Sequence, residues 1–288
     1  MLGVALALLS ALASGISVVS VRKHSEGASV FNMSLVITAV GMAVLWPLAL
    51  GEGLFEAMTL AGFAFFAVSG LLSPGLVRLF YYKGLKDLGA SVNSSIFAVY
   101  PLYALLPAVL LLNEIVTAWN LLGIIAIIVG VILVERCMNG KRGHENIGWK
   151  GIVAPLLGGL MLGGATIFRK FALEESNAPV LGVAIAYVFS LLPYLFALGG
   201  YSPLRKDLSL KKDFRWFWVA GIGQAVSWLL AFYALSFEQV SITTPLLAVE
   251  PLFVVAFGYF YVRELERVSA KLAASIAICV LGVALITL

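Results

Sequence analysis

Two segments of the chain, 150 residues apart, are copies of one another. Residues 85–114 (LKDLGASVNSSIFAVYPLYALLPAVLLLNE) align without a gap on residues 235–264 (LSFEQVSITTPLLAVEPLFVVAFGYFYVRE), and both contain an AVxPL core and end in a glutamate. A shared motif at a fixed offset is typical of a duplicated structural unit. The fold must therefore be built from two related halves. The identical pairs are Leu85 and Leu235, Ser91 and Ser241, Ala98 and Ala248, Val99 and Val249, Pro101 and Pro251, Leu102 and Leu252, and Glu114 and Glu264.

Each copy is an apolar segment long enough to cross a lipid bilayer, and it begins after a polar turn and ends at a charged residue. Apolar residues make up 61% of the whole chain and charged residues 12%. A soluble domain contains about half apolar and about a quarter charged residues. We therefore predict an all-α integral membrane protein of the cell membrane that crosses the bilayer many times.

Apolar segments that could each form a transmembrane helix recur along the chain, five in each half. This arrangement predicts a first five-helix repeat at residues 1–138, a polar linker at 139–148 and a second repeat at 149–288. Because five is an odd number, the second repeat must enter the membrane in the opposite orientation. Inverted repeats of this kind place a substrate site near the midplane, between the halves. The ten predicted segments are 2–21, 29–50, 59–82, 89–112, 118–135, 149–169, 179–199, 214–236, 241–262 and 269–288.

The basic residues predict the orientation in the membrane. Arg78 lies inside a segment, and Arg169 and Lys170 lie at an even-numbered connection. All other Lys and Arg residues lie in or beside the odd-numbered connections. Cytoplasmic loops carry an excess of Lys and Arg. The odd-numbered connections are therefore expected in the cytoplasm, with both termini outside.

The motifs of the two halves resemble those of a known family. AVYPL and AVEPL are each followed by a terminal glutamate and then by a glycine-bearing apolar segment, around Gly130 in the first half and Gly282 in the second. This pattern resembles the EamA-type ten-helix members of the drug/metabolite transporter superfamily over the whole chain. The resemblance implies secondary transport or export of a small metabolite through a central cavity, with the fifth and tenth helices peripheral. Members have both termini in the cytoplasm, and the charge distribution here departs from that arrangement.

Two charged residues, Arg78 and Glu250, lie well inside the predicted segments. A charge at such a depth costs several kcal/mol unless it faces a wet cavity or a partner. Arg78 follows Pro74 and Gly75, which can loosen the helix. Its guanidinium could bind a carboxylate or a phosphate, and the alternative is a structural pair or a side chain that reaches the membrane surface.

Glu250 directly precedes Pro251, which has no backbone N–H and therefore favours a kink. A carboxyl group beside a kink could take up a proton or a sodium ion, or bind the ammonium group of a substrate. The alternative is a neutral glutamate bonded to the backbone. The duplication places Tyr100 at the position of Glu250, and Trp228 at that of Arg78, so the halves share a backbone and differ in polar chemistry.

Further polar and aromatic side chains on the fourth and eighth segments could line the cavity. Tyr100 and Tyr103 are three residues apart and share a helix face, and Gln224 and Trp228 are four apart and do likewise. Aromatic walls with a few hydrogen-bonding groups suit an amphipathic or amino-acid-like solute. The alternative for each is packing or a position at the membrane interface. The predicted substrate-binding residues are Arg78, Asn93, Tyr100, Tyr103, Gln224, Trp228 and Glu250, with Glu250 also the candidate for ion coupling.

Glu114 and Glu264 end their segments at the membrane interface. We expect both to be structural, through pairing with Arg263 or with another cation of a loop. Neither is therefore a predicted substrate-binding residue.

The function best supported by the sequence is a secondary transporter, an exporter of an amino acid or an organic anion. A membrane-embedded enzyme would need a cluster of His, Asp or Glu or a nucleophile–base pair, and the chain contains no HExxH, GxSxG or phosphate-binding loop motif. A receptor or scaffold is the remaining alternative. We expect no cofactor, no metal and no nucleic-acid partner, a proton as a possible coupling ion, and a monomer or a homodimer.

Overall fold

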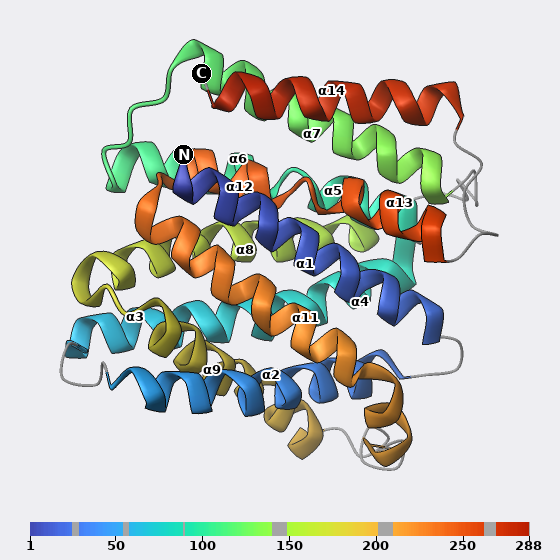
Figure 1. Cartoon of the computed structure of the whole chain (residues 1–288). Coiled ribbons are helices and arrows are strands. Elements are labelled where there is room, and N and C mark those ends of the chain that lie inside the picture. The colour runs from blue at the N-terminus through green and yellow to red at the C-terminus, as the bar shows by residue number, and fades with distance from the viewer. Residues whose placement is uncertain are drawn as a thin grey trace.

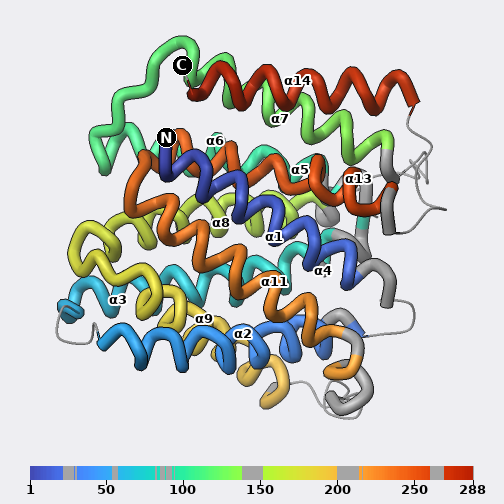
Figure 2. Tube along the Cα trace, viewed as in Figure 1, coloured from blue at the N-terminus to red at the C-terminus, as the bar shows by residue number. Residues whose placement is uncertain are grey.

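The computed structural model describes residues 1–24, 29–53, 58–88, 90–139, 149–200, 210–261 and 269–287 (Figure 2). These residues form helices joined by short turns, and none of them forms a strand. Figure 1 shows the helices side by side along a common direction, with the connections at the two ends of the bundle. The all-α prediction is confirmed.

The helices follow one another in two similar sets. The first set is α1 (Leu2–His24), α2 (Val30–Glu52), α3 (Leu60–Gly70) with the π-helix η2 (Leu71–Leu76) and α4 (Val77–Leu88), α5 (Ala90–Phe97), α6 (Tyr100–Leu111) and α7 (Ala118–Asn139). The second set is α8 (Trp149–Ser176), α9 (Pro179–Gly200), α11 (Leu210–Phe237), α12 (Val240–Leu247), α13 (Glu250–Tyr261) and α14 (Ala270–Ile286).

The helices are long and apolar enough for a multi-pass membrane protein. Among the described residues, eight helical stretches meet the length and hydropathy of a membrane span. Two shorter apolar helices, Ser95–Leu111 and Ala270–Ile286, complete the set. The multi-pass character is confirmed, whereas the crossing of the bilayer by all ten stays a prediction.

The two ends of the bundle carry different parts of the chain. Both termini and the turns at 112–117, 177–178 and 238–239 lie at one end (Figure 1), which we call the termini face. Helices α1, α7 and α13 end at the opposite end, where α8 begins, which we call the linker face. α1 leaves the termini face, whereas α8 leaves the linker face, so the two sets begin at opposite ends.

The repeated AVxPL motif breaks one helix in each half. α5 ends at Phe97 and α6 begins at Tyr100, and α12 and α13 are separated at the corresponding positions, Ala248 and Val249. A proline has no N–H for the carbonyl four residues earlier. For Pro101 and Pro251 those carbonyls belong to the last residues of α5 and α12. The kink predicted before Pro251 is confirmed, and Pro101 has the same effect.

The third predicted segment is also interrupted, at the site where Pro74 and Gly75 are expected to loosen it. Ser73 leaves the helical conformation, with φ −143° and ψ 122°, within η2. Its carbonyl group is thereby released from the regular helical hydrogen bonds and can accept a bond from another element. α11, the corresponding helix of the second half, runs without an interruption.

The packing of the two halves is reciprocal. α1 lies against α11 and α13, and α8 lies against the corresponding elements of the first half, α3, α4 and α6. α2 packs on α11 in the same way as α9 packs on α3 and η2. Each half therefore completes the core of the other, as expected for two interlocked repeats.

The sixth helix is longer than the sequence predicts. The predicted segment 149–169 ends at the Arg169–Lys170 pair, but α8 continues to Ser176. It ends where Asn177 takes a left-handed backbone conformation, with φ 34°, and donates its N–H to the Leu173 carbonyl at 2.8 Å. Arg169 and Lys170 therefore lie inside a membrane span, Ile152–Ser176.

α7 and α14 form a close pair through small residues at the outer edge of the bundle (Figure 1). A Cβ atom added to Gly130 would lie 2.4 Å from the Cys279 Sγ atom and 2.9 Å from the Cys279 backbone nitrogen. A Cβ atom added to Gly282 would lie 2.8 Å from the Gly123 carbonyl oxygen. The glycines that mark the repeat in the sequence therefore set the distance between these helices.

We expect Gly130→Ala to lower the thermal stability of the protein. Overpacking of a tight contact costs about 1–3 kcal/mol, which exceeds the gain of about 1 kcal/mol in helix propensity. The melting temperature in detergent, followed by tryptophan fluorescence, measures the change. Gly164→Ala is the matched control, because a Cβ atom there meets nothing within 4 Å, and it is expected to leave the melting temperature unchanged or raise it. Equal melting temperatures for the two variants would contradict this account of the α7–α14 contact.

Candidate functional site

A cavity of about 250 Å³ lies between the two halves. Both broken helices reach it, because Ala98, Ala248 and Glu250 are part of its lining. On the side of the linker face it extends to Tyr81 of α4 and Glu135 of α7. Its polar lining comprises Ser10, Ser14, Tyr81, Tyr100, Glu135, Thr166, Arg169, Gln224, Ser227, Trp228 and Glu250.

Arg169 of α8 is the cationic residue in the lining of this cavity. Its side chain is only 2% exposed. The Nη2 atom donates to the Ser73 carbonyl at 2.6 Å, which is the carbonyl released by the interruption at η2. The guanidinium carbon lies 4.3 Å from the centre of the Trp228 ring, a favourable cation–π contact. The orientation of Arg169 is therefore fixed by both halves.

The cavity also contains hydrogen-bond donors without a partner. Among the described residues, neither the Nε atom of Arg169 nor the Nε1 atom of Trp228 has an acceptor. A buried donor that is left unpaired costs about 1–3 kcal/mol. An acceptor in the cavity, such as a carboxylate, would remove this cost.

Glu250 brings a carboxyl group to the same cavity. It is the first residue of α13, and the N-terminus of a helix stabilises negative charge. The hydroxyl group of Ser14 donates to its carboxylate. Ser14 belongs to the small-residue face of α1, from which Ser10 also donates to the Ser227 carbonyl of α11, at 2.7 Å. Glu250 is thus held between the break and α1.

Tyr100 connects the two broken helices. It is the first residue of α6, and its hydroxyl group donates to the Thr244 carbonyl of α12 at 3.1 Å. The corresponding position in the second half is Glu250, as the duplication predicts. The cavity therefore has equivalent breaks on two sides, one followed by a phenol and the other by a carboxyl group.

Four of the predicted binding residues, Tyr100, Gln224, Trp228 and Glu250, line the cavity. Arg78 does not line it. The Nη1 atom of Arg78 donates to the Thr38 hydroxyl of α2 at 2.9 Å and lies 3.5 Å from the Ser34 carbonyl. These contacts correspond to the structural pairing that is the alternative interpretation of Arg78 from the sequence.

Asn93 and Tyr103 also lie outside the lining. Asn93 is fully buried, and its Nδ2 atom donates to the Tyr81 carbonyl at 3.1 Å. Tyr103 packs against the backbone of Gly163 and beside Gly159 of α8. A direct role in substrate binding for Arg78, Asn93 and Tyr103 stays a prediction. In the structure, these three residues contact neighbouring helices.

Two charged residues that line the cavity, Arg169 and Glu135, are not among the predicted binding residues. Arg169 was predicted as the last residue of its segment, and the prediction that only Arg78 and Glu250 are charged residues well inside the spans is wrong, because α8 continues to Ser176. No glycine or proline occurs between Gly164 and Ser176, and this signal could have extended the helix past Arg169. Glu135 was placed at the end of the fifth segment, but α7 continues to Asn139, so this helix contributes to the cavity as well.

The described residues contain no group of three or more His, Cys, Asp or Glu side chains that could hold a metal ion. The two described cysteines, Cys137 and Cys279, are both free thiols. The chemistry of the cavity is that of a guanidinium, carboxyl groups, hydroxyl groups and aromatic rings. Such a set can bind a solute with an anionic and a cationic group.

Comparisons with known proteins agree with this description. The model of the EamA-like transporter family matches residues 1–136 and 149–288. A search of curated protein sequences found no match. A comparison with solved structures found 25 chains that match this protein. One crystal structure is matched over 99% of this chain and 95% of that chain, with a TM-score of 0.75 and 14% sequence identity, which shows a shared fold.

Proposed function

Because the chain belongs to the EamA-like transporter family over both of its halves, we propose that it is a secondary transporter for a small zwitterionic metabolite, such as an amino acid. The solute binds in the cavity between the halves. Organic anions are the second class of substrate that the cavity can accept.

The observation that carries this proposal is the buried Arg169. A guanidinium at this depth is costly unless it has a function or a partner. Arg169 is oriented by Ser73 and Trp228, and its Nε atom has no acceptor among the described residues. Arginine is well suited to binding a carboxylate through two parallel hydrogen bonds. Arg169 therefore takes the role that the sequence suggested for Arg78.

The second charged group of the proposal is Glu250. Its carboxylate can accept the ammonium group of the solute, or a proton that is exchanged against the solute. Trp228 and Tyr100 supply apolar walls near these two groups. The volume of about 250 Å³ lies just below the range of about 300–1,000 Å³ that is usual for drug-sized ligands, which favours a small metabolite.

Alternating access between the two faces is the mode of transport that the inverted repeats support. We propose export, with the odd-numbered connections in the cytoplasm as the basic residues indicate, and with a proton as the coupling ion. Transport leaves the solute chemically unchanged, and this property separates a transporter from an enzyme in any assay.

The experiment that tests the proposal is uptake of labelled solutes into proteoliposomes, with and without an imposed pH gradient. The panel contains amino acids, organic acids and organic cations. For the best amino acid, two matched solutes follow, the amine without its carboxyl group and the acid without its amino group. We expect the amino acid to be transported and the amine to be transported much more slowly.

Transport of organic cations alone would contradict the proposed role of Arg169. If the acid without its amino group were transported as fast as the amino acid, the proposed substrate class would change from a zwitterion to an organic anion. Chemical conversion of a solute would identify an enzyme.

A further inference from the structure

The short helix α12 separates the cavity from the termini face. It begins beside the turn at 238–239 and ends at Leu247, which lines the cavity. Six of its eight residues are buried. Thr243, in its middle, is completely buried and its hydroxyl group has no partner among the described residues. α12 therefore closes the cavity on this side, although it is only two turns long.

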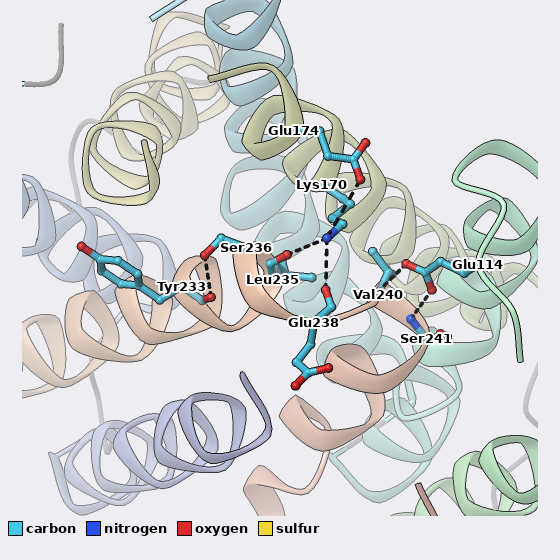
Figure 3. Close-up of polar contacts among 9 residues, drawn as sticks. All are labelled: Glu114, Lys170, Glu174, Tyr233, Leu235, Ser236, Glu238, Val240 and Ser241. Carbon is cyan, nitrogen blue, oxygen red and sulfur yellow. Dashed lines mark hydrogen bonds and ion pairs between the residues drawn. The ribbon is translucent and has the colours of Figure 1, made fainter. Parts of the chain in front are cut away.

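The N-terminus of α12 is held by the carboxylate of Glu114. The Val240 N–H donates to its Oε1 atom at 2.6 Å, and the Ser241 N–H donates to its Oε2 atom at 2.9 Å (Figure 3). Glu114 is 7% exposed. Hydrogen bonds to an ionised group are shorter and about twice as strong as neutral ones. Among the described residues, the partner of Glu114 is thus backbone of the other half. The expected pairing with Arg263 stays a prediction, because Arg263 and Glu264 lie outside the described residues.

The position of Glu114 is fixed by the end of α6. Asn113 has a left-handed conformation, with φ 53°. The N–H of Glu114 then bonds to the Ala108 carbonyl at 3.2 Å, which also accepts from the Leu112 N–H at 3.1 Å at the end of α6. Glu114 is thereby attached rigidly to α6, one of the two helices that follow a break.

A second clamp holds the residues that precede α12. The Nζ atom of Lys170 donates to the carbonyls of Leu235 and Glu238, at 2.9 and 3.2 Å, at the end of α11 (Figure 3). Lys170 comes from α8, directly after Arg169 of the cavity. The start of α12 and the turn before it are therefore tied to two other elements.

Two residues of α5, the corresponding helix of the first half, are less buried than their counterparts in α12. Ser95 and Ile96 of α5 are half-buried, whereas Pro245 and Leu246 at the matching positions of α12 are buried. The cavity also extends to Tyr81 and Glu135 on the side of the linker face. The structure is thus closed more firmly toward the termini face.

We propose that α12 is the gate of the cavity toward the termini face and that Glu114 is the latch that keeps it closed. Opening on this face requires the two N–H groups of α12 to leave the Glu114 carboxylate, while the break at 248–249 serves as the hinge. The gate acts on access of water and solute to the cavity, so it can be tested without knowledge of the substrate.

The test measures how fast a water-soluble maleimide labels a thiol on α12, in full-length protein in nanodiscs. The reporter is Thr243→Cys, which replaces a hydroxyl group that has no partner among the described residues. Cys137→Ser removes an exposed thiol, and the buried Cys279 between α7 and α14 is kept as an internal reference. We expect Glu114→Gln to increase labelling of the reporter about tenfold, since one of the two bonds is lost and the other loses its charge assistance, with Cys279 unchanged.

Glu174→Gln is the matched control for the loss of negative charge. Glu174 lies near the same face, is 53% exposed and pairs with Lys170 only at 4.0 Å. We expect no change in the labelling rate. A labelling rate that Glu114→Gln leaves unchanged would overturn the proposal, because the bond would then not control access to α12. An equal increase in the Glu174→Gln control, or at Cys279, would also overturn it, because the effect would then not be specific to the bond or to α12.

A second variant removes a donor of the latch on α12 instead of the acceptor on Glu114. Val240 is the first residue of α12, a position where proline is favoured, and Gln239 before it has the extended conformation that proline requires, with φ −68° and ψ 151°. Val240→Pro deletes the N–H that bonds to Glu114 and leaves the carboxylate in place. Faster labelling of the reporter, by about threefold for one bond of two, is expected here as well, and unchanged labelling would contradict the latch even if Glu114→Gln fails to fold.

Discussion

Replacement of Arg169 by glutamine is expected to lower transport of a zwitterionic solute by roughly 10- to 100-fold. A hydrogen bond to a charged group contributes about 1.5–3 kcal/mol, and about 1.4 kcal/mol corresponds to a factor of ten. Glutamine keeps a polar side chain but has no charge for a carboxylate. Initial rates of uptake into proteoliposomes, over a range of solute concentrations, measure the loss.

Two further variants separate binding from folding. Arg169→Lys keeps the positive charge but not the planar fork that matches a carboxylate, so we expect partial transport. Arg78→Gln removes the other intramembrane arginine, whose described contacts are with Thr38 and Ser34 of α2, and transport is expected to persist in folded protein. If Arg78→Gln abolished transport and Arg169→Gln did not, the two arginines would have the opposite roles.

Replacement of Glu250 by glutamine is expected to abolish accumulation driven by a pH gradient while exchange of solute across the membrane continues. One proton per solute molecule and a gradient of one pH unit support about tenfold accumulation. Glutamine has nearly the same size and can still bond to Ser14, but it cannot release a proton. Uptake with and without the gradient, together with counterflow of labelled against unlabelled solute, checks both parts of the prediction.

Glu135→Gln is the control for this experiment. Glu135 is the other carboxyl group of the cavity, but it belongs to the uninterrupted helix α7 and not to one of the broken helices. We expect this variant to respond to the gradient as the parent does. Loss of the response in Glu135→Gln, with the response retained in Glu250→Gln, would assign the coupling proton to Glu135.

The architecture could be predicted because it follows from local signals that occur twice. The offset of 150 residues between the AVxPL motifs predicts two halves, and the missing N–H of Pro251 predicts a kink. The interruption near Ser73 follows in the same way from Pro74. These features depend on backbone chemistry within a few residues, so no knowledge of the tertiary structure is needed.

The cavity itself could be predicted only in part. Tyr100, Gln224, Trp228 and Glu250 line it, because polar groups deep in an apolar segment have few other places. Arg169 was missed because a basic pair resembles the end of a membrane helix. Its charge is tolerated inside the span only through contacts with Ser73 and Trp228, which are distant in sequence, and such contacts cannot be read from a local pattern.

The bond between Tyr100 and the Thr244 carbonyl has a consequence for the ion gradient across the membrane. If the two broken helices moved separately, the protein would pass through a state open at both faces, and protons would leak through it without solute. Tyr100 follows one break and Thr244 precedes the other, so their bond is a second tie between α6 and α12, beside the two bonds of Glu114. Opening toward the termini face then requires both ties to be released together, and we expect the membrane to stay sealed against protons while either of them holds.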